Sequence, residues 1–143
     1  MPTFPIDWSD RKEIGKTKEY VSAIGLGTWA IRDYKRAEEV FVYALEHGID
    51  NVDTAEMYGN GAEEFIGRVI ERVGREKVFI TTKMLPEHLT SKDNVLKAAQ
   101  ASLKRLRVKE VDLFLIHWPN PYLPIDLQVR NFEVIYSKGL ARY

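Results

Sequence analysis

The sequence contains no cysteine, which excludes disulfide bonds, thiol nucleophiles and thiolate metal sites. It has only three histidines, and no two of them stand at the spacing typical of metal ligands. Neither sign of charge is in excess, because 21 basic residues are balanced by 21 acidic ones. Nucleic-acid binding needs a local excess of Lys and Arg. We therefore expect no metal site and no nucleic-acid partner.

Long hydrophobic runs are also missing. No apolar stretch approaches the roughly 18 residues that a membrane helix requires. Residues 1–5 show neither the basic and apolar regions nor the small-residue cleavage site of a secretory leader. These absences predict a cytoplasmic protein with no membrane contact. With 45% hydrophobic residues, the 143-residue chain can form one domain, 1–143, with a substantial core.

What the sequence does contain is a regular alternation of short β-branched runs and longer segments of helical period. Turn residues around 14–17 suggest a small hairpin ahead of this repeat. Alternation of this kind produces a parallel sheet with right-handed crossovers. The expected strands cover residues 21–26, 49–53, 78–83 and 111–117, and the expected helices cover 35–47, 62–73, a segment capped at 90–93 and a weaker one ending at 138–139.

Two architectures fit this pattern: a doubly wound open sheet, or part of a (β/α)8 barrel. No Gly-x-Gly-x-x-Gly or Walker phosphate loop follows any of the expected strands. The segment 25–29, Gly-Leu-Gly-Thr-Trp, is too short for the dinucleotide fingerprint and lacks its third glycine. The barrel is therefore favoured, although the open sheet is not excluded.

Ionisable residues stand at the ends of three successive strands. Asp53, Lys83 and His117 are each one β/α unit apart, and Tyr58 follows Asp53 in the next loop. The carboxyl ends of parallel strands lie at one face of the sheet, where barrel enzymes carry out catalysis. Taken singly, each has an ordinary structural explanation: a helix cap, a rim lysine, a core histidine or a packed turn. Their joint placement favours an active site.

The same segments resemble the aldo-keto reductase family in order and spacing. The resemblance is carried by Gly-Leu-Gly-Thr-Trp at 25–29, Asp-Thr-Ala-Glu-Met-Tyr-Gly-Asn at 53–60, Thr-Thr-Lys at 81–83 and Asp-Leu-Phe-Leu-Ile-His-Trp-Pro at 112–119. It spans about residues 14–143. It implies a TIM-type barrel and a catalytic tetrad of Asp53, Tyr58, Lys83 and His117. It also implies NADP(H), with NAD(H) open, near Gly27, Thr28, Trp29 and Asp53.

The chemistry is consistent with these implied roles. Reduction of a carbonyl needs a hydride from a nicotinamide and a proton for the oxygen. Tyr58 would donate the proton, Lys83 would stabilise the resulting tyrosinate, and Asp53 would orient Lys83. His117 would hydrogen-bond the substrate oxygen. Trp29 and Trp118 would form walls of a pocket for a small carbonyl substrate.

A complete barrel typically needs about 250 residues, whereas only four β/α units are expected here. By the same resemblance, the family's later strands carry most of the cofactor contacts, which leaves open whether this chain alone binds NADPH and whether it is active. Half a barrel would leave its first and fourth strands as open edges and expose Ile80, Leu113 and Leu115. Self-association through these edges is therefore expected. A nicotinamide-binding sensor and a truncated, non-functional half-barrel are the alternatives.

Overall fold

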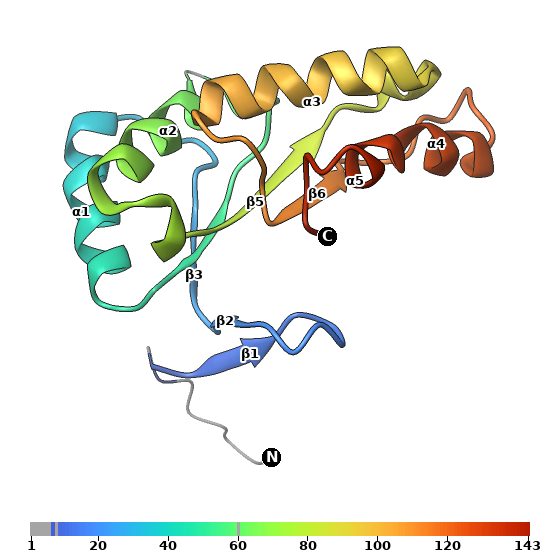
Figure 1. Ribbon diagram of the computed structural model, residues 1–143. Coiled ribbons are helices and arrows are strands. Elements are labelled where there is room, and N and C mark those ends of the chain that lie inside the picture. Colours follow the sequence, from blue (N-terminus) through green and yellow to red (C-terminus); the bar gives the residue numbers. More distant parts are fainter. Residues whose placement is uncertain (1–6, 8, 60) are drawn as a thin grey trace, which may run out of the picture.

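A computed structural model describes residue 7, residues 9–59 and residues 61–143 of the chain. The N-terminal segment 1–5 and Asn60, the last residue of the 53–60 motif, lie outside the described residues. The fold begins with an antiparallel hairpin of β1 (Arg11–Glu13) and β2 (Tyr20–Ser22). A parallel sheet follows, with its four strands in chain order (Figure 1). These strands are β3 (Gly25–Gly27), β4 (Asn51–Asp53), β5 (Phe79–Met84) and β6 (Leu113–Ile116).

Helices connect the parallel strands and lie along the outer side of the sheet (Figure 1). The connecting helices are α1 (Tyr34–Glu46), α2 (Ala62–Val73) and α3 (Lys92–Leu106), with short 3-10 helices η1 (Arg75–Lys77) and η2 (Pro86–Thr90) beside them. The weak helical pattern after the fourth strand forms two short helices, α4 (Ile125–Phe132) and α5 (Val134–Ser137). The chain is therefore an α/β fold of four strand–helix units with an N-terminal hairpin.

The first expected strand, 21–26, is divided in the structure. Val21 and Ser22 pair antiparallel with β1, and only Gly25 onward joins the parallel sheet. The Ser22 hydroxyl accepts hydrogen bonds from the amides of Asp50 and Asn51, which holds the hairpin at the start of β4. A Cβ at Gly25 would lie 2.9 Å from the Asn51 carbonyl oxygen, so β3 can approach β4 this closely only with glycine there. The other three strands begin and end within two residues of expectation.

The hydrophobic core lies between the sheet and the helices. Val52 and Ile80 are neighbours in register on β4 and β5, and both are fully buried against α2 and α3 side chains. The expectation that Ile80 would be exposed on an open inner face is therefore wrong, because Ile80 points to the helix side of β5. Leu115, by contrast, is 36% exposed. The uncovered face of the sheet is the one that carries Asp53 and Lys83.

Residues after α5 return to the sheet and lie beside β6. Val111 and Ala141 form a parallel bridge, and the Tyr143 amide donates to the Asp112 carbonyl at 2.9 Å. The Phe114 amide in turn donates to the Tyr143 carbonyl at 3.1 Å. Residues 141–143 therefore follow the course of a further parallel strand along β6. The outer side of β3 has no strand partner within the described ranges.

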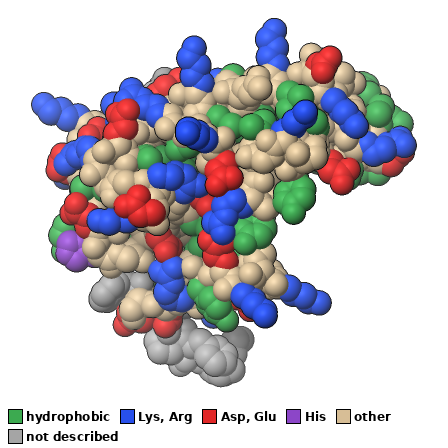
Figure 2. Space-filling model, viewed as in Figure 1, with side chains coloured by type: hydrophobic (Ala, Val, Ile, Leu, Met, Phe, Trp, Pro, Cys, Tyr) green, Lys and Arg blue, Asp and Glu red, His purple; other side chains and the backbone are tan. Residues whose placement is uncertain are grey.

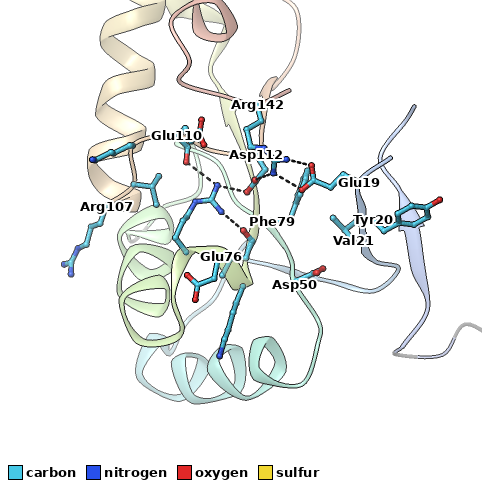
Figure 3. A pocket seen from close by; sticks show the side chains of 15 residues that line it. Glu19, Tyr20, Val21, Asp50, Glu76, Phe79, Arg107, Glu110, Asp112 and Arg142 are labelled. Atoms are coloured by element: carbon cyan, nitrogen blue, oxygen red, sulfur yellow. Dashed lines mark hydrogen bonds and ion pairs between the residues drawn. The ribbon is translucent and has the colours of Figure 1, made fainter. Parts of the chain in front are cut away.

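A salt-bridge network closes the amino-terminal edge of the sheet (Figure 3). Asp112 is almost fully buried and accepts from Arg75 at 2.7 Å and from Arg142 at 2.8 Å. Arg142 also binds Glu19 of the hairpin at 2.5 Å, so the hairpin is tied to the C-terminal residues. A cavity of about 660 Å³ lies among these groups. Four of its charged side chains, Glu19, Arg142, Asp112 and Arg75, form one continuous chain of ion pairs.

Candidate active site

The carboxyl edge of the sheet brings together an acid, an amine and a phenol. The Lys83 Nζ, near the end of β5, donates to the Asp53 Oδ2 at 2.7 Å and to the Thr54 carbonyl at 2.9 Å. The same nitrogen lies 3.1 Å from the Tyr58 hydroxyl. The Lys83 side chain is only 15% exposed. Its ammonium is thus held by three oxygens in a partly desolvated place, where charge-assisted hydrogen bonds are strong.

Strand pairing that continues past β4 sets this geometry. Asp53 is in register with Thr81, and the Thr54 amide then donates to the Thr81 carbonyl at 2.9 Å. The next link is from the Glu56 amide to the Lys83 carbonyl at 3.3 Å. A turn follows, in which the Tyr58 amide donates to the Ala55 carbonyl at 3.1 Å. Tyr58 is therefore directed back over the end of β5.

His117 follows β6 and completes the group. Its backbone amide donates to the Met84 carbonyl at 2.9 Å, and its ring centroid lies 5.7 Å from that of Tyr58. The ring nitrogen Nδ1 is buried and has no hydrogen-bond partner among the described residues. Burial lowers the pKa of His117, and the nearby Lys83 charge lowers it further, whereas Asp53 opposes this. The imidazole is therefore neutral at pH 7.

The two tryptophans stand next to different members of this group. The Trp29 ring packs edge-on to Tyr58, with centroids 5.1 Å apart, and is 63% exposed. The Trp118 ring is 4.7 Å from that of His117 and is 43% exposed. Such exposed aromatic surface beside polar groups suits an apolar part of a small ligand.

The residues expected to contact the cofactor differ in how exposed they are and in how many hydrogen bonds they already make. Gly27 is exposed, and a Cβ there would meet no atom within 4 Å. The Asp53 side chain is 45% exposed. The Thr28 hydroxyl is buried and engaged with the Asp53 carbonyl at 3.1 Å and the Thr54 hydroxyl at 2.9 Å. The Thr28 amide also donates to the Asp53 carbonyl at 3.1 Å, so Thr28 joins β3 to β4 through both its side chain and its backbone.

Sequence reasoning missed a second layer of acids behind the site. Glu56 and Glu63 are both largely buried, and Arg105 of α3 lies between them. Burial raises the pKa of Glu56, while the Leu85 amide, His88 and Arg105 act in the opposite direction. One feature of the sequence could have indicated these buried acids: Glu63 is an acidic residue among the apolar residues of the buried α2 face.

The site is separate from the larger cavity of Figure 3, which lies at the opposite edge of the sheet. No group of three or more His, Asp or Glu side chains in the described part of the chain is arranged to hold a metal ion. Across these same residues, no helix is long and apolar enough to cross a membrane. Acidic and basic side chains are interspersed over the face shown in Figure 2.

Several known proteins are similar to this chain in sequence and in fold. The profile of the Aldo/keto reductase family matches residues 23–143. Aldo-keto reductase YhdN of Bacillus subtilis is 35% identical over 146 residues, which cover 90% of this chain and 44% of YhdN. The crystal structure of the thermostable aldo-keto reductase Tm1743, in complex with the inhibitor epalrestat, superposes with a TM-score of 0.85 at 39% identity. That match covers 93% of this chain and 52% of Tm1743.

An aldo-keto reductase from Klebsiella pneumoniae in complex with NADPH superposes with a TM-score of 0.73 at 35% identity. That match covers 86% of this chain and 44% of the Klebsiella chain. The present chain thus spans about half the length of the relatives that it matches. Since the family profile matches most of its residues, the chain belongs to the Aldo/keto reductase family.

Proposed function

We propose that the protein reduces an aldehyde or a ketone to an alcohol, and that Tyr58 donates the proton to the carbonyl oxygen. The observation that carries this proposal is the continuous contact from Asp53 through Lys83 to the Tyr58 hydroxyl, at 2.7 and 3.1 Å. When the phenol gives up its proton, the neighbouring ammonium stabilises the negative charge that remains. Asp53 orients the Lys83 side chain through their contact at 2.7 Å.

His117 is proposed to hydrogen-bond the substrate oxygen. A neutral imidazole can donate one hydrogen bond without repelling Lys83, and the ring stands beside Tyr58. A donor of this kind typically stabilises the transition state by about 3 kcal/mol. Trp29 and Trp118 would wall the apolar part of the substrate.

A nicotinamide cofactor, when bound, supplies the hydride for this reaction. Gly27, Trp29 and Asp53 would hold it at the carboxyl edge of the sheet, and Thr28 would support them through its hydrogen bonds to Asp53 and Thr54. NADP(H) is our choice because the Klebsiella relative was crystallised with NADPH, and NAD(H) is the alternative. Further contacts to the cofactor would come from the part of the barrel that this chain does not span.

We also propose that the exposed sheet surfaces associate with further protein, a second copy in the simplest case. The outer side of β3 has no strand partner in the described chain, and Leu115 is 36% exposed on the inner face. Unpaired strand edges and apolar faces favour such association.

Titration of NADPH with the purified protein, followed by addition of a simple aldehyde, tests the function. A change in NADPH fluorescence on binding, followed by loss of NADPH absorbance with the aldehyde, is the expected result. Binding without consumption would instead indicate a nicotinamide sensor. If the protein neither binds nor consumes NADPH, both the reductase role and the sensor role are contradicted.

A further inference from the structure

Glu56 lies two residues before Tyr58, and its side chain is only 11% exposed. It contacts the backbone of Lys83 and that of Leu85, the residue that follows β5. Its backbone amide donates to the Lys83 carbonyl at 3.3 Å, and its Oε1 accepts from the Leu85 amide at 2.5 Å. A single residue therefore joins the loop that carries Tyr58 to the backbone that carries Lys83.

Two side chains on other elements face the Glu56 carboxylate. The His88 Nε2 of η2 lies 3.3 Å from the Oε1, and the Arg105 Nη2 of α3 lies 3.9 Å from the Oε2. Arg105 also binds the buried Glu63 at 2.6 Å. Glu63 in turn accepts from the Thr82 hydroxyl at 2.7 Å, next to Lys83 on the other face of β5.

After Tyr58, the described part of the loop is held by the Tyr34 hydroxyl, which donates to the Gly59 carbonyl at 3.0 Å. Gly59 and Gly61 follow Tyr58, and Gly61 has a positive φ of 81°. A loop rich in glycine loses more backbone entropy when it is held in one conformation. The hydrogen bond from Leu85 to Glu56 is therefore the fixed point of this loop on the side of Tyr58 that precedes it in the chain.

We infer that Glu56 is a positioning residue, which holds the Tyr58 hydroxyl against the Lys83 ammonium through its hydrogen bond from the Leu85 amide. Displacement of a reacting group by about 1 Å can cost roughly 100-fold in rate. The importance of this contact for catalysis rests on the proposed function, whereas the contact itself can be tested without turnover.

The test compares Glu56→Ala with Glu56→Gln, since glutamine keeps an oxygen that can accept from Leu85 and alanine does not. Glu87→Ala is the matched control, because Glu87 is an exposed glutamate on η2. The readout is the nuclear Overhauser signal between the Tyr58 ring and the Lys83 side chain, whose Nζ lies 4.8 Å from the ring centroid. This signal is assigned by its loss in Tyr58→Ala, which removes the ring protons.

We expect the signal to persist in Glu56→Gln and in Glu87→Ala. In Glu56→Ala the signal should fall to about one third. It depends on the inverse sixth power of the distance between the Tyr58 ring and the Lys83 side chain, and we expect this distance to grow by about 1 Å. An undiminished signal in Glu56→Ala would overturn the inference. Should Glu56→Ala not fold, Glu56→Asp takes its place, because the shorter carboxylate withdraws from Leu85 while keeping the charge.

Kinetics separate this inference from the proposed function. If the protein consumes NADPH, Glu56→Ala should lower kcat while the KM for the aldehyde stays within about twofold, since the proposed substrate contacts are Trp29, Trp118 and His117. A rise in KM with unchanged kcat would contradict a role in positioning Tyr58. If the protein does not consume NADPH, the proposed function fails, and the Overhauser signal alone decides on the contact.

Discussion

His117 is held as a neutral base by its surroundings. Burial lowers its pKa first, and the Lys83 charge adds to this. An imidazole kept uncharged can serve as a hydrogen-bond donor to a carbonyl oxygen without acting as a competing acid. The pKa of this one ring is therefore a direct measure of how the site is arranged.

We predict that the ring signals of His117 titrate in NMR spectra with a midpoint below about 6.5, the usual value for histidine. Replacement of Lys83 by Met removes the neighbouring positive charge and should raise this midpoint. Because the folded protein binds this proton less readily than the unfolded chain, His117 stabilises the fold above about pH 6.5. This contribution is lost as the pH falls through the lowered pKa. A midpoint above that of a free histidine would contradict this description of the site.

The four candidate catalytic residues could be located from the sequence because their positions follow from topology. Asp53, Lys83 and His117 end strands of one parallel sheet, so they must share an edge whatever the side-chain details. Glu56 and Glu63 could not be assigned in this way. Their partners, Leu85 and Arg105, are 29 and 42 residues away, and only the packing of α2 against α3 brings the second pair together.

At the scale of the elements, α2 and α3 approach each other most closely at Gly67. A Cβ at this position would lie 2.6 Å from the Arg105 carbonyl oxygen. We predict that Gly67→Ala lowers the free energy of unfolding by about 1–3 kcal/mol, because the helices must move apart. Lys97→Ala, on the exposed face of α3, should change it by less than about 0.5 kcal/mol. Urea denaturation measures the free energy of unfolding of both variants. If Gly67→Ala and Lys97→Ala were equally stable, the helices would be able to separate at Gly67 without a loss of stability.

The division of the expected strand 21–26 is also a matter of elements. Its residues form one continuous run in the sequence, and local pattern alone cannot show where the chain changes partners. The change is dictated by β1, which pairs with Val21 and Ser22, and by the Ser22 contacts to the start of β4. Segment 62–73, in contrast, was expected with its exact bounds, since its apolar residues recur with helical period between two glycines.

At the scale of the whole molecule, the uncovered face of the sheet is the surface that favours association with another protein chain. We predict that light scattering on the purified protein gives a mass above that of one chain and that this mass rises with concentration. Leu115→Lys places a charge on the exposed inner face and should lower the association. A well-folded monomer at every concentration would contradict the proposed self-association.

The four strand–helix units and their order were predictable from the alternation of strand and helix patterns alone. Which side chains of the sheet face the helices was not predictable in this way. Ile80 was assigned to the open face, yet it lies in the helix-covered core beside Val52. The run Val-Phe-Ile-Thr-Thr-Lys is apolar at successive positions, so its two faces cannot be told apart without the register to β4. Residues 141–143 likewise join the sheet through pairing that no local pattern specifies.

The central claim is that Tyr58 gives the proton to a carbonyl oxygen. The most direct measurement is the rate at which the purified protein and its Tyr58→Phe variant consume NADPH with a simple aldehyde, alongside the affinity of each for NADPH. We predict that the variant loses at least about 100-fold in rate, the usual contribution of a positioned acid, while its NADPH affinity stays near that of the parent. An equal rate of NADPH consumption in the two proteins would contradict the claim.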